Sequence, residues 1–207
     1  MFLKREKEFQ YHPGIELILE DVIGGGTIAR TDFAGAIFKG VALAELPPLV
    51  IVVKDESTGI YHALKTAEIT EAVAEDATGY PVKKNHLFAV GDAVTLGGDF
   101  EKAADVISAI DKTDPDFDMV TLAGTIGEAK VGDVLVLAKA KAAAGSAKQK
   151  YGDLDSELPV TMNKVDLTVA NQLSGLLLRG TVNGSVLPFP IDSVLKARLR
   201  KQGLRIA

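Results

Sequence analysis

The chain contains no cysteine and no tryptophan, and aromatic residues make up only 6% of its 207 residues. Without cysteine it can form no disulfide, no zinc–thiolate site and no thiol nucleophile, which leaves its redox compartment open. The scarcity of aromatic side chains argues against a sugar-binding platform, which needs exposed rings. Alanine, valine, leucine and glycine dominate the composition, so we expect a core of small aliphatic layers.

Long apolar runs are also absent. No stretch approaches the roughly 20 residues that a membrane span needs, and the N-terminal residues 1–8 lack a hydrophobic signal segment. We therefore expect a protein that does not contact a membrane and is not exported by a cleaved signal. A hydrophobic content of 47% with 25% charged residues is typical of a globular protein with a real core. A net charge of -5 argues against a general nucleic-acid binder.

Positive charges nevertheless gather at the C-terminal end of the chain, at Lys196, Arg198, Arg200, Lys201 and Arg205. One interpretation is a C-terminal helix whose cations suit the negative end of its dipole. The other is a basic patch that docks on an acidic partner. On the second interpretation, the candidate partner-binding residues are Lys196, Arg198, Arg200 and Lys201.

One motif occurs twice, in Val90–Leu96 and in Val131–Leu137. In each copy a Val-Gly-Asp triplet precedes a run of valine, leucine or threonine. Glycine and aspartate adopt the dihedral angles of tight turns, and the run that follows suits a half-buried strand. The motif therefore predicts β architecture and carries no catalytic signature.

Most of the remaining chain also has the signature of strands separated by turns. Residues 27–30 and 36–43 are predicted to form a hairpin, and Leu49–Val53 is apolar enough to be buried on both faces. Residues 66–77 fit either a short helix or a strand. Residues 16–23 fit either a strand or a short helix. Further strands are expected at 60–64, 87–96, 104–110, 117–122, 165–169 and 176–182.

The C-terminal end predicts the one clear helix. It should begin at Asp192, whose carboxylate can cap it, and end before Gly203. Residues 204–206 could add an edge strand. The residues expected to face inward are Val194, Leu195 and Leu199.

We therefore expect a mainly β fold, with a barrel-like or sandwich β body and a smaller C-terminal β-plus-helix part. Residues 1–23 should form an N-terminal arm and the first element, and residues 24–138 the β body. Residues 139–157, rich in alanine, lysine and glycine, are expected to be a linker or exposed loop. Residues 158–207 should form the C-terminal part.

Two motifs resemble ligand sites but lack the required context. Gly24–Ala29 has the spacing of a dinucleotide fingerprint, yet no helix is predicted to open there, so a glycine hinge is the better interpretation. Residues 114–118 alternate carboxylates like a calcium loop. Met119 stands where that loop requires glycine and Thr125 where it requires glutamate, which excludes an EF-hand. A weak cation site and a solvated turn both stay open.

The three histidines, His12, His62 and His86, lie far apart and have no metal-ligand or catalytic spacing. His62 alternates with Tyr61 on a predicted strand and is expected at the surface or at an edge. We assign no catalytic, cofactor-binding or metal-binding residue, and expect a protein that is not an enzyme.

The order of several segments resembles that of tailed-bacteriophage head decoration and head fiber proteins. The likeness extends from about Gly24 to Leu137, and the C-terminal stretch 173–180 is similar to the ends of such proteins. The segments are Gly25–Arg30 to Phe38–Gly40, Gly79–Val82, Phe88–Val94, Ile107–Lys112 and Val131–Leu135.

This resemblance implies a non-enzymatic virion protein that binds the major capsid protein on the outer surface of an icosahedral head, as a homotrimer and without a cofactor. An N-terminal arm, residues 1–14, would place Phe2, Phe9 and Tyr11 against that partner. A frayed terminus is the alternative for this segment. The rival functions are a β-rich surface-binding or adhesion module, and a small enzyme with a dispersed active site.

Overall fold

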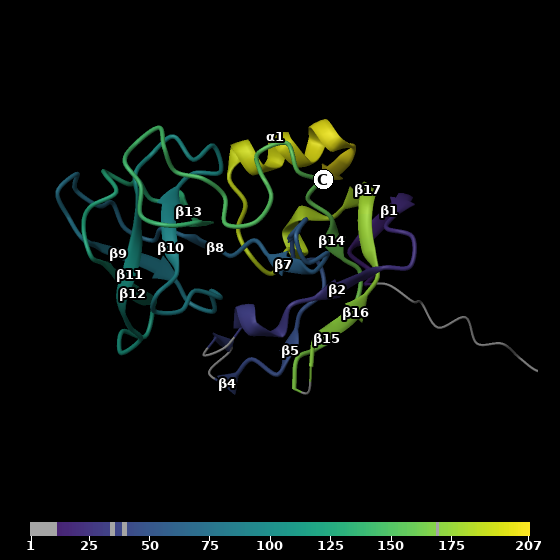
Figure 1. Ribbon diagram of the computed structural model, residues 1–207. Coiled ribbons are helices and arrows are strands. Elements are labelled where there is room, and N and C mark those ends of the chain that lie inside the picture. Colours follow the sequence, from purple (N-terminus) through teal and green to yellow (C-terminus); the bar gives the residue numbers. More distant parts are fainter. Residues whose placement is uncertain (1–11, 34–35, 39–40, 169) are drawn as a thin grey trace, which may run out of the picture.

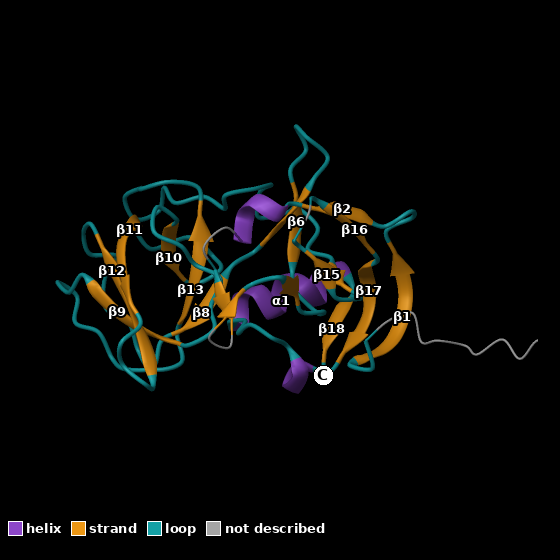
Figure 2. Cartoon of the chain, turned by 90° about the horizontal axis from the view of Figure 1, so that it is seen from below, coloured by secondary structure: helices purple, strands orange, loops and turns teal. Residues whose placement is uncertain are grey.

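A computed structural model describes residues 12–33, 36–38, 41–168 and 170–207 (Figure 1). The chain is mainly β, with several sheets and one α-helix near its C-terminal end. The body is sandwich-like and contains no closed barrel among these residues, which confirms the predicted fold class. Figures 1 and 2 show the strands β8 to β13 on one side of the molecule and the other strands on the opposite side. We call these groups the middle lobe and the outer lobe.

The middle lobe is one six-stranded sheet in the order β8-β13-β10-β11-β12-β9. The sheet curls around an apolar interior, and Ile69, just after β8, forms an antiparallel bridge with Val82 in β9. This single bridge brings the two end strands together without a full ladder between them. The strands are β8 (Thr66–Glu68), β9 (Gly79–Lys83), β10 (Ala93–Leu96), β11 (Ala104–Asp111), β12 (Phe117–Leu122) and β13 (Val134–Ala138).

The outer lobe contains β17, with β1 along one edge and β14 and β18 pairing with its two ends. A second sheet has the order β16-β2-β7-β6, and β3–β4 and β5–β15 form two-stranded sheets. The strands are β1 (Ile15–Asp21), β2 (Gly26–Ile28), β3 (Ile37–Phe38), β4 (Val41–Ala42), β5 (Glu45–Leu46), β6 (Val52–Lys54), β7 (Tyr61–Ala63), β14 (Val160–Thr161), β15 (Val165–Asp166), β16 (Gln172–Ser174), β17 (Leu176–Val182) and β18 (Leu204–Ile206).

The predicted hairpin of residues 27–30 and 36–43 is wrong. β2 pairs with β16 and β7, and a 3-10 helix at Arg30–Phe33 separates it from the small β3–β4 hairpin. The predicted strand at 87–96 is also shorter, because only Ala93–Leu96 forms β10. Residues 66–77, left open between helix and strand, contain β8 at Thr66–Glu68.

The helix α1 (Ser193–Gln202) has the predicted bounds. The Asp192 carboxylate accepts a hydrogen bond from the Leu195 amide at 2.7 Å, and Gly203 ends the helix with a φ of 99°. Leu195 and Leu199 are completely buried, whereas Val194 is only half-buried. β18 follows at once and pairs parallel with β17, as an edge strand.

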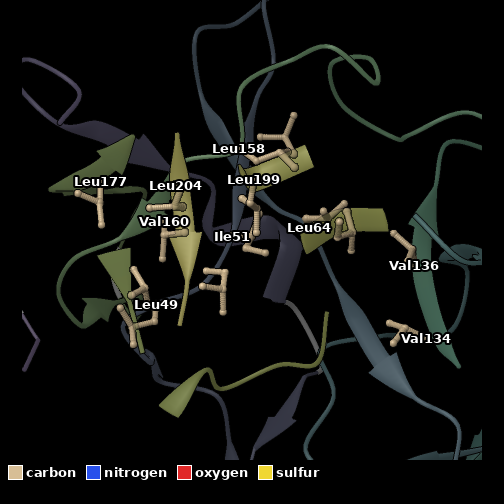
Figure 3. Close-up of a cluster of buried hydrophobic side chains, with 14 of the residues drawn as sticks. Leu49, Ile51, Leu64, Val134, Val136, Leu158, Val160, Leu177, Leu199 and Leu204 are labelled. Carbon is tan, nitrogen blue, oxygen red and sulfur yellow. The ribbon is translucent and has the colours of Figure 1, made fainter. Parts of the chain in front are cut away.

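β13 shows why the two lobes pack as one body. Its residues alternate between two cores: Leu135 and Leu137 face the interior of the middle lobe, while Val134, Val136 and Ala138 face the core of the outer lobe. Figure 3 shows Val134 and Val136 on the strand that borders this second core, with Leu64 on the side that faces them. Burial on both faces explains the unbroken apolar run of this strand.

Strands from different parts of the domain division expected from the sequence pair within the same sheet. β1, inside the expected 1–23 unit, pairs with β17, inside the expected 158–207 unit. Residues 26–63, placed in the expected 24–138 body, supply strands of the outer lobe. The expected linker 139–157 makes bridges to the middle lobe, Ala142 with Ala104 and Gln149 with Ala138.

Candidate functional site

The two Val-Gly-Asp motifs form equivalent turns. In the first, the Asp92 amide donates to the Ala89 carbonyl at 3.1 Å; in the second, the Asp133 amide donates to the Lys130 carbonyl at 3.0 Å. Gly91 and Gly132 have φ angles of 93° and 89°, which glycine adopts without strain. Both motifs are turns that feed a central strand, as predicted.

Asp92 is also part of a polar cluster where the chain passes between the lobes. The Lys65 ammonium lies 2.6 Å from the Asp92 carboxylate, and the Lys150 ammonium lies 3.4 Å from its other oxygen. The side chains of Lys65 and Asp92 are 4% and 9% exposed. Charges so far from water are stable only when they are paired, so these three residues hold one another in place.

Tyr151, the residue after Lys150, connects this cluster to His62 and Asp32. The His62 Nδ1 lies 2.9 Å from both Asp32 oxygens, and because a carboxylate only accepts, Nδ1 carries the proton. The Tyr151 ring stacks on His62 with centroids 3.6 Å apart, and its hydroxyl donates to Asp32 at 3.4 Å. Burial, and then the Asp32 charge, raise the pKa of Tyr151 to about 12, so the phenol stays protonated.

We call Asp32, His62, Lys65, Asp92, Lys150 and Tyr151 the junction cluster. Each of its carboxylates already accepts several donors: Asp32 also receives the Ala63 amide at 3.2 Å, and Asp92 the Ala89 amide at 3.0 Å. His62, expected at the surface or at an edge, is half-buried on β7 and held on both sides. These contacts therefore hold in place the chain segments that connect the two lobes.

A second buried carboxylate, Asp118, lies in the middle lobe. Lys84 lies 2.9 Å from it, Lys112 3.9 Å and the His86 Nε2 3.2 Å, although this nitrogen makes no hydrogen bond there. The His86 Nδ1 accepts from the Phe88 amide at 3.1 Å. Burial and then the Lys112 charge lower the pKa of His86 to about 4, so the ring is neutral at neutral pH.

The carboxylates of residues 114–118 do not converge on a cation. Asp114 accepts the backbone amides of Asp116 and Phe117 at 2.8 and 3.3 Å, while Asp118 points into the lobe. Among the described residues, no group of three or more histidine, cysteine, aspartate or glutamate side chains could hold a metal ion. Of the two interpretations left open, this geometry favours the turn.

The glycine fingerprint has a packing role. β2 begins at Gly26, and among the described residues that follow it Arg30–Phe33 forms a short 3-10 helix, not an α-helix that could receive a pyrophosphate. A Cβ on Gly26 would lie 2.4 Å from the Leu176 side chain and 2.5 Å from the Tyr61 ring. Glycine is therefore required here by close packing between strands.

The sequence-predicted partner-binding residues fall into three groups. Phe2, Phe9 and Tyr11 lie outside the described residues. Lys196, Arg200 and Lys201 are exposed on α1, and the Lys201 ammonium is 3.6 Å from Asp155.

Arg198 faces the protein instead. Its guanidinium donates to the Gln149 side chain at 3.0 Å and to the Asp153 carbonyl at 3.3 Å, and burial lowers its pKa. Arg198 therefore ties the helix to the 139–157 segment, whereas Lys196 and Arg200 remain available to a partner.

A cleft of about 810 Å³ lies between the lobes. One wall comes from the middle lobe and contains Glu68 and the segment Lys83–His86. The other comes from the outer lobe and contains Pro47, Pro48 and residues 186–191. The described lining of the cleft contains two histidines, His12 and the buried, neutral His86, and one carboxylate, Glu68.

The exposed apolar side chains have a more distinctive arrangement. Leu17 and Leu19 on the edge strand β1 are 48% and 69% exposed, and Ile23 in the following turn is 98% exposed. Leu173 on β16 is 69% exposed and lies beside Gly25 of that turn. We call Leu17, Leu19, Ile23 and Leu173 the apolar rim.

No family model matches this chain, and no curated protein or solved structure matches it either. In the part of the chain that the structure describes, no helix is long and apolar enough to cross a membrane. Function therefore has to be inferred from the residues and surfaces described above.

The sequence did not point to the junction cluster. Asp92 was assigned to a turn, and Asp32, Lys65, Lys150 and Tyr151 had no assigned role. One local signal was present: Lys65 directly follows the apolar residues Ala63 and Leu64, a position where a buried and unpaired cation would be costly.

Proposed function

We propose that this chain is a structural virion protein that binds the outer surface of a bacteriophage capsid, as a decoration or head fiber protein. The apolar rim carries the proposal. Single exposed leucines are ordinary, but three large apolar side chains on one edge strand and its following turn, with Leu173 of β16 beside that turn, are typical of an interaction surface.

The position of the rim suits attachment to a large partner. Among the described residues β1 pairs only with β17, so its outer edge is open for contact. Leu17 and Leu19 are both exposed on this strand, whose pairing with β17 is irregular between Ile18 and Glu20. Glu16 and Asp21 flank them and are exposed, which favours a partner surface that combines apolar and basic groups.

The partner in this proposal is the major capsid protein, and the assembly is a homotrimer on the capsid surface of the virion. A stable contact of this kind covers about 800 Å² on each partner. The two-faced packing of β13 supports the role, because it joins the lobes into one rigid body that can transmit load across a shell.

A shallow exposed groove lined by Tyr61, Tyr80 and Phe88 would favour the rival adhesion module. Tyr80 and Phe88 are buried at 0% and 1% exposure, so these rings line no such groove. The capsid-binding role is therefore the one that we carry forward.

The test mixes the purified chain with capsids that were assembled without it, and measures bound copies per capsid by sedimentation. Light scattering on the free protein gives its oligomeric state. We expect stoichiometric, saturable binding. The double variant Leu17→Ser with Leu19→Ser should weaken binding at least tenfold, because each leucine loses about 1.5–3 kcal/mol of apolar burial.

The matched control is Val90→Ser, which changes a side chain that is 63% exposed on the middle lobe, away from the rim. It should bind like the unchanged protein. Absence of binding by the unchanged protein would overturn the proposal, and equal binding by the rim variant would show that a different face attaches.

A further inference from the structure

The middle lobe carries a group of exposed carboxylates in the segment that joins β8 to β9 and in the loop beside it. We call Glu71, Glu75, Asp76 and Glu128 the acidic patch. None of these four side chains forms an ion pair or a hydrogen bond with another described residue. Lys130, the nearest cation along the chain, is exposed and pairs with none of them. The patch therefore presents uncompensated negative charge to the solvent.

The backbone holds the two parts of the acidic patch side by side. Val73, between Glu71 and Glu75, forms an antiparallel bridge with Ala129, and their amides donate to each other's carbonyls at 2.8 and 3.0 Å. Both bridge residues are buried in the core of the middle lobe. The exposed residues on either side of Val73 are alanines. The carboxylates therefore stand on a fixed surface whose other side chains are small.

The outer face of α1 carries the opposite charge. Lys196 and Arg200 lie four residues apart, which places them on the same side of the helix. Both are exposed, and neither side chain forms an ion pair with another described residue. The exposed neighbours Ser193 and Ala197 are small, so a partner surface can approach this face closely.

The acidic patch and the basic face of α1 belong to different lobes. Val73 packs in the core of the middle lobe, whereas α1 packs through Leu195 and Leu199 in the core of the outer lobe. Figures 1 and 2 both show β9, which follows the acidic segment, on the side of the middle lobe away from α1. Opposite charges that lie apart on one molecule favour contact between two molecules, because each surface repels its own kind and attracts the other.

We infer that the acidic patch of one copy of this chain docks on Lys196 and Arg200 of a second copy. Such a contact joins two different surfaces, and copies joined in this way form a ring when their rotation closes. Three copies complete the ring in a homotrimer, so the inference rests on the proposed function and names the surfaces that join its subunits. The apolar rim lies on other elements and is left for the capsid.

The test reverses the charge of each surface and contains no capsid. One variant is Lys196→Glu with Arg200→Glu, and the other is Glu71→Lys with Glu75→Lys. Sedimentation equilibrium at low salt measures self-association, which should weaken as salt is added because exposed charges are screened. We expect each variant to associate at least tenfold more weakly than the unchanged protein.

An equimolar mixture of the two variants should associate again. In mixed complexes the native patch of the first variant meets the native helix of the second, and the two reversed surfaces also have opposite charges. A gain of association on mixing requires these two surfaces to touch, since a general effect of net charge on the fold would not produce it.

The matched control is Lys139→Glu with Lys148→Glu, which changes the net charge by the same amount as the helix variant. Both lysines are exposed and lie outside the two surfaces. This control should associate like the unchanged protein. A monomeric unchanged protein would overturn the inference, and so would a mixture of the two variants that stays dissociated. Capsid binding by a monomer would remove the ring and leave the proposed attachment to the capsid in place.

Discussion

Asp92 and Asp133 close equivalent turns with equivalent bonds, yet only Asp92 also holds a buried cation. The Asp92 carboxylate accepts the Ala89 amide at 3.0 Å, and the Asp133 carboxylate accepts the Lys130 amide at 2.8 Å. Asp92 alone lies 2.6 Å from the buried Lys65 ammonium. The repeated sequence motif therefore has one copy that shapes a turn and one that also fixes the junction between the lobes.

The first prediction compares Asp92→Asn with Asp133→Asn. Asparagine keeps an oxygen that can accept the turn amide in both variants, so the turns should survive. Asp92→Asn leaves Lys65 buried without its counter-charge and should lower the free energy of unfolding by about 3–5 kcal/mol. Asp133→Asn changes an exposed side chain and should cost less than about 1 kcal/mol. Urea unfolding measures both.

Equal losses for the two variants would contradict a special role for the junction cluster. Adding Lys65→Met to Asp92→Asn should restore part of the stability, because the buried charge is then removed together with its partner.

Local signals explain what could be predicted from the sequence. The helix α1 depends on Asp192 and Gly203, which act on neighbouring residues, and both ends were predicted correctly. β13 was predicted because its sequence is a continuous run of apolar residues, and such a run is stable only when it is buried. The chain around Arg30–Phe33 also looked local, but the predicted hairpin is wrong because β2 pairs with β16 and β7, which are distant in sequence.

Long-range pairing explains most of what could not be predicted. β1 pairs with β17, and the two strands are separated by most of the chain, so no turn between them records their partnership. The junction cluster likewise joins residues from Asp32 to Tyr151. Each member alone is an ordinary polar residue in the sequence, and only the fold brings them together.

The second prediction concerns the Asp192 carboxylate, which joins the helix to the middle lobe. One oxygen caps the Leu195 amide at 2.7 Å, and the other accepts the Gly98 amide at 2.7 Å. Asp192→Ala removes both bonds and should cost about 2 kcal/mol in thermal or urea unfolding. Asp192→Asn, which keeps one acceptor, should cost less than half of that. A loss below about 0.5 kcal/mol for the alanine variant would contradict the bridging role.

The third prediction contrasts Gly26, in β2, with Gly175, which lies between β16 and β17. Gly26→Ala forces a methyl group into Leu176 and Tyr61 and should destabilise the fold by about 1–3 kcal/mol. At Gly175 the nearest atom to an added Cβ is the Met162 sulfur at 3.4 Å, an ordinary contact, so Gly175→Ala should change stability by less than about 1 kcal/mol. Chemical unfolding measures the stability of both variants. Equal losses of stability would argue against a packing role for Gly26.

The last prediction is a loss of stability in acid that depends on His86. The folded protein has a His86 pKa of about 4, below the ordinary value of 6.5, because burial and the Lys112 charge disfavour the protonated ring. Between these two values the unfolded chain binds a proton that the folded chain does not. The contribution of His86 to the free energy of unfolding is therefore fully present above pH 6.5 and is lost as the pH decreases toward 4.

The groups that face His86 are Asp118, Lys112 and Lys65, and only Asp118 favours its protonation. His86→Gln removes the titrating ring while keeping an acceptor for the Phe88 amide. The loss of unfolding free energy from pH 7.5 to pH 4.5 should be about 2 kcal/mol smaller in His86→Gln than in the unchanged protein. Proton NMR titration of the His86 ring gives its pKa directly, and a value near 6.5 in the folded state would show that burial does not exclude the proton.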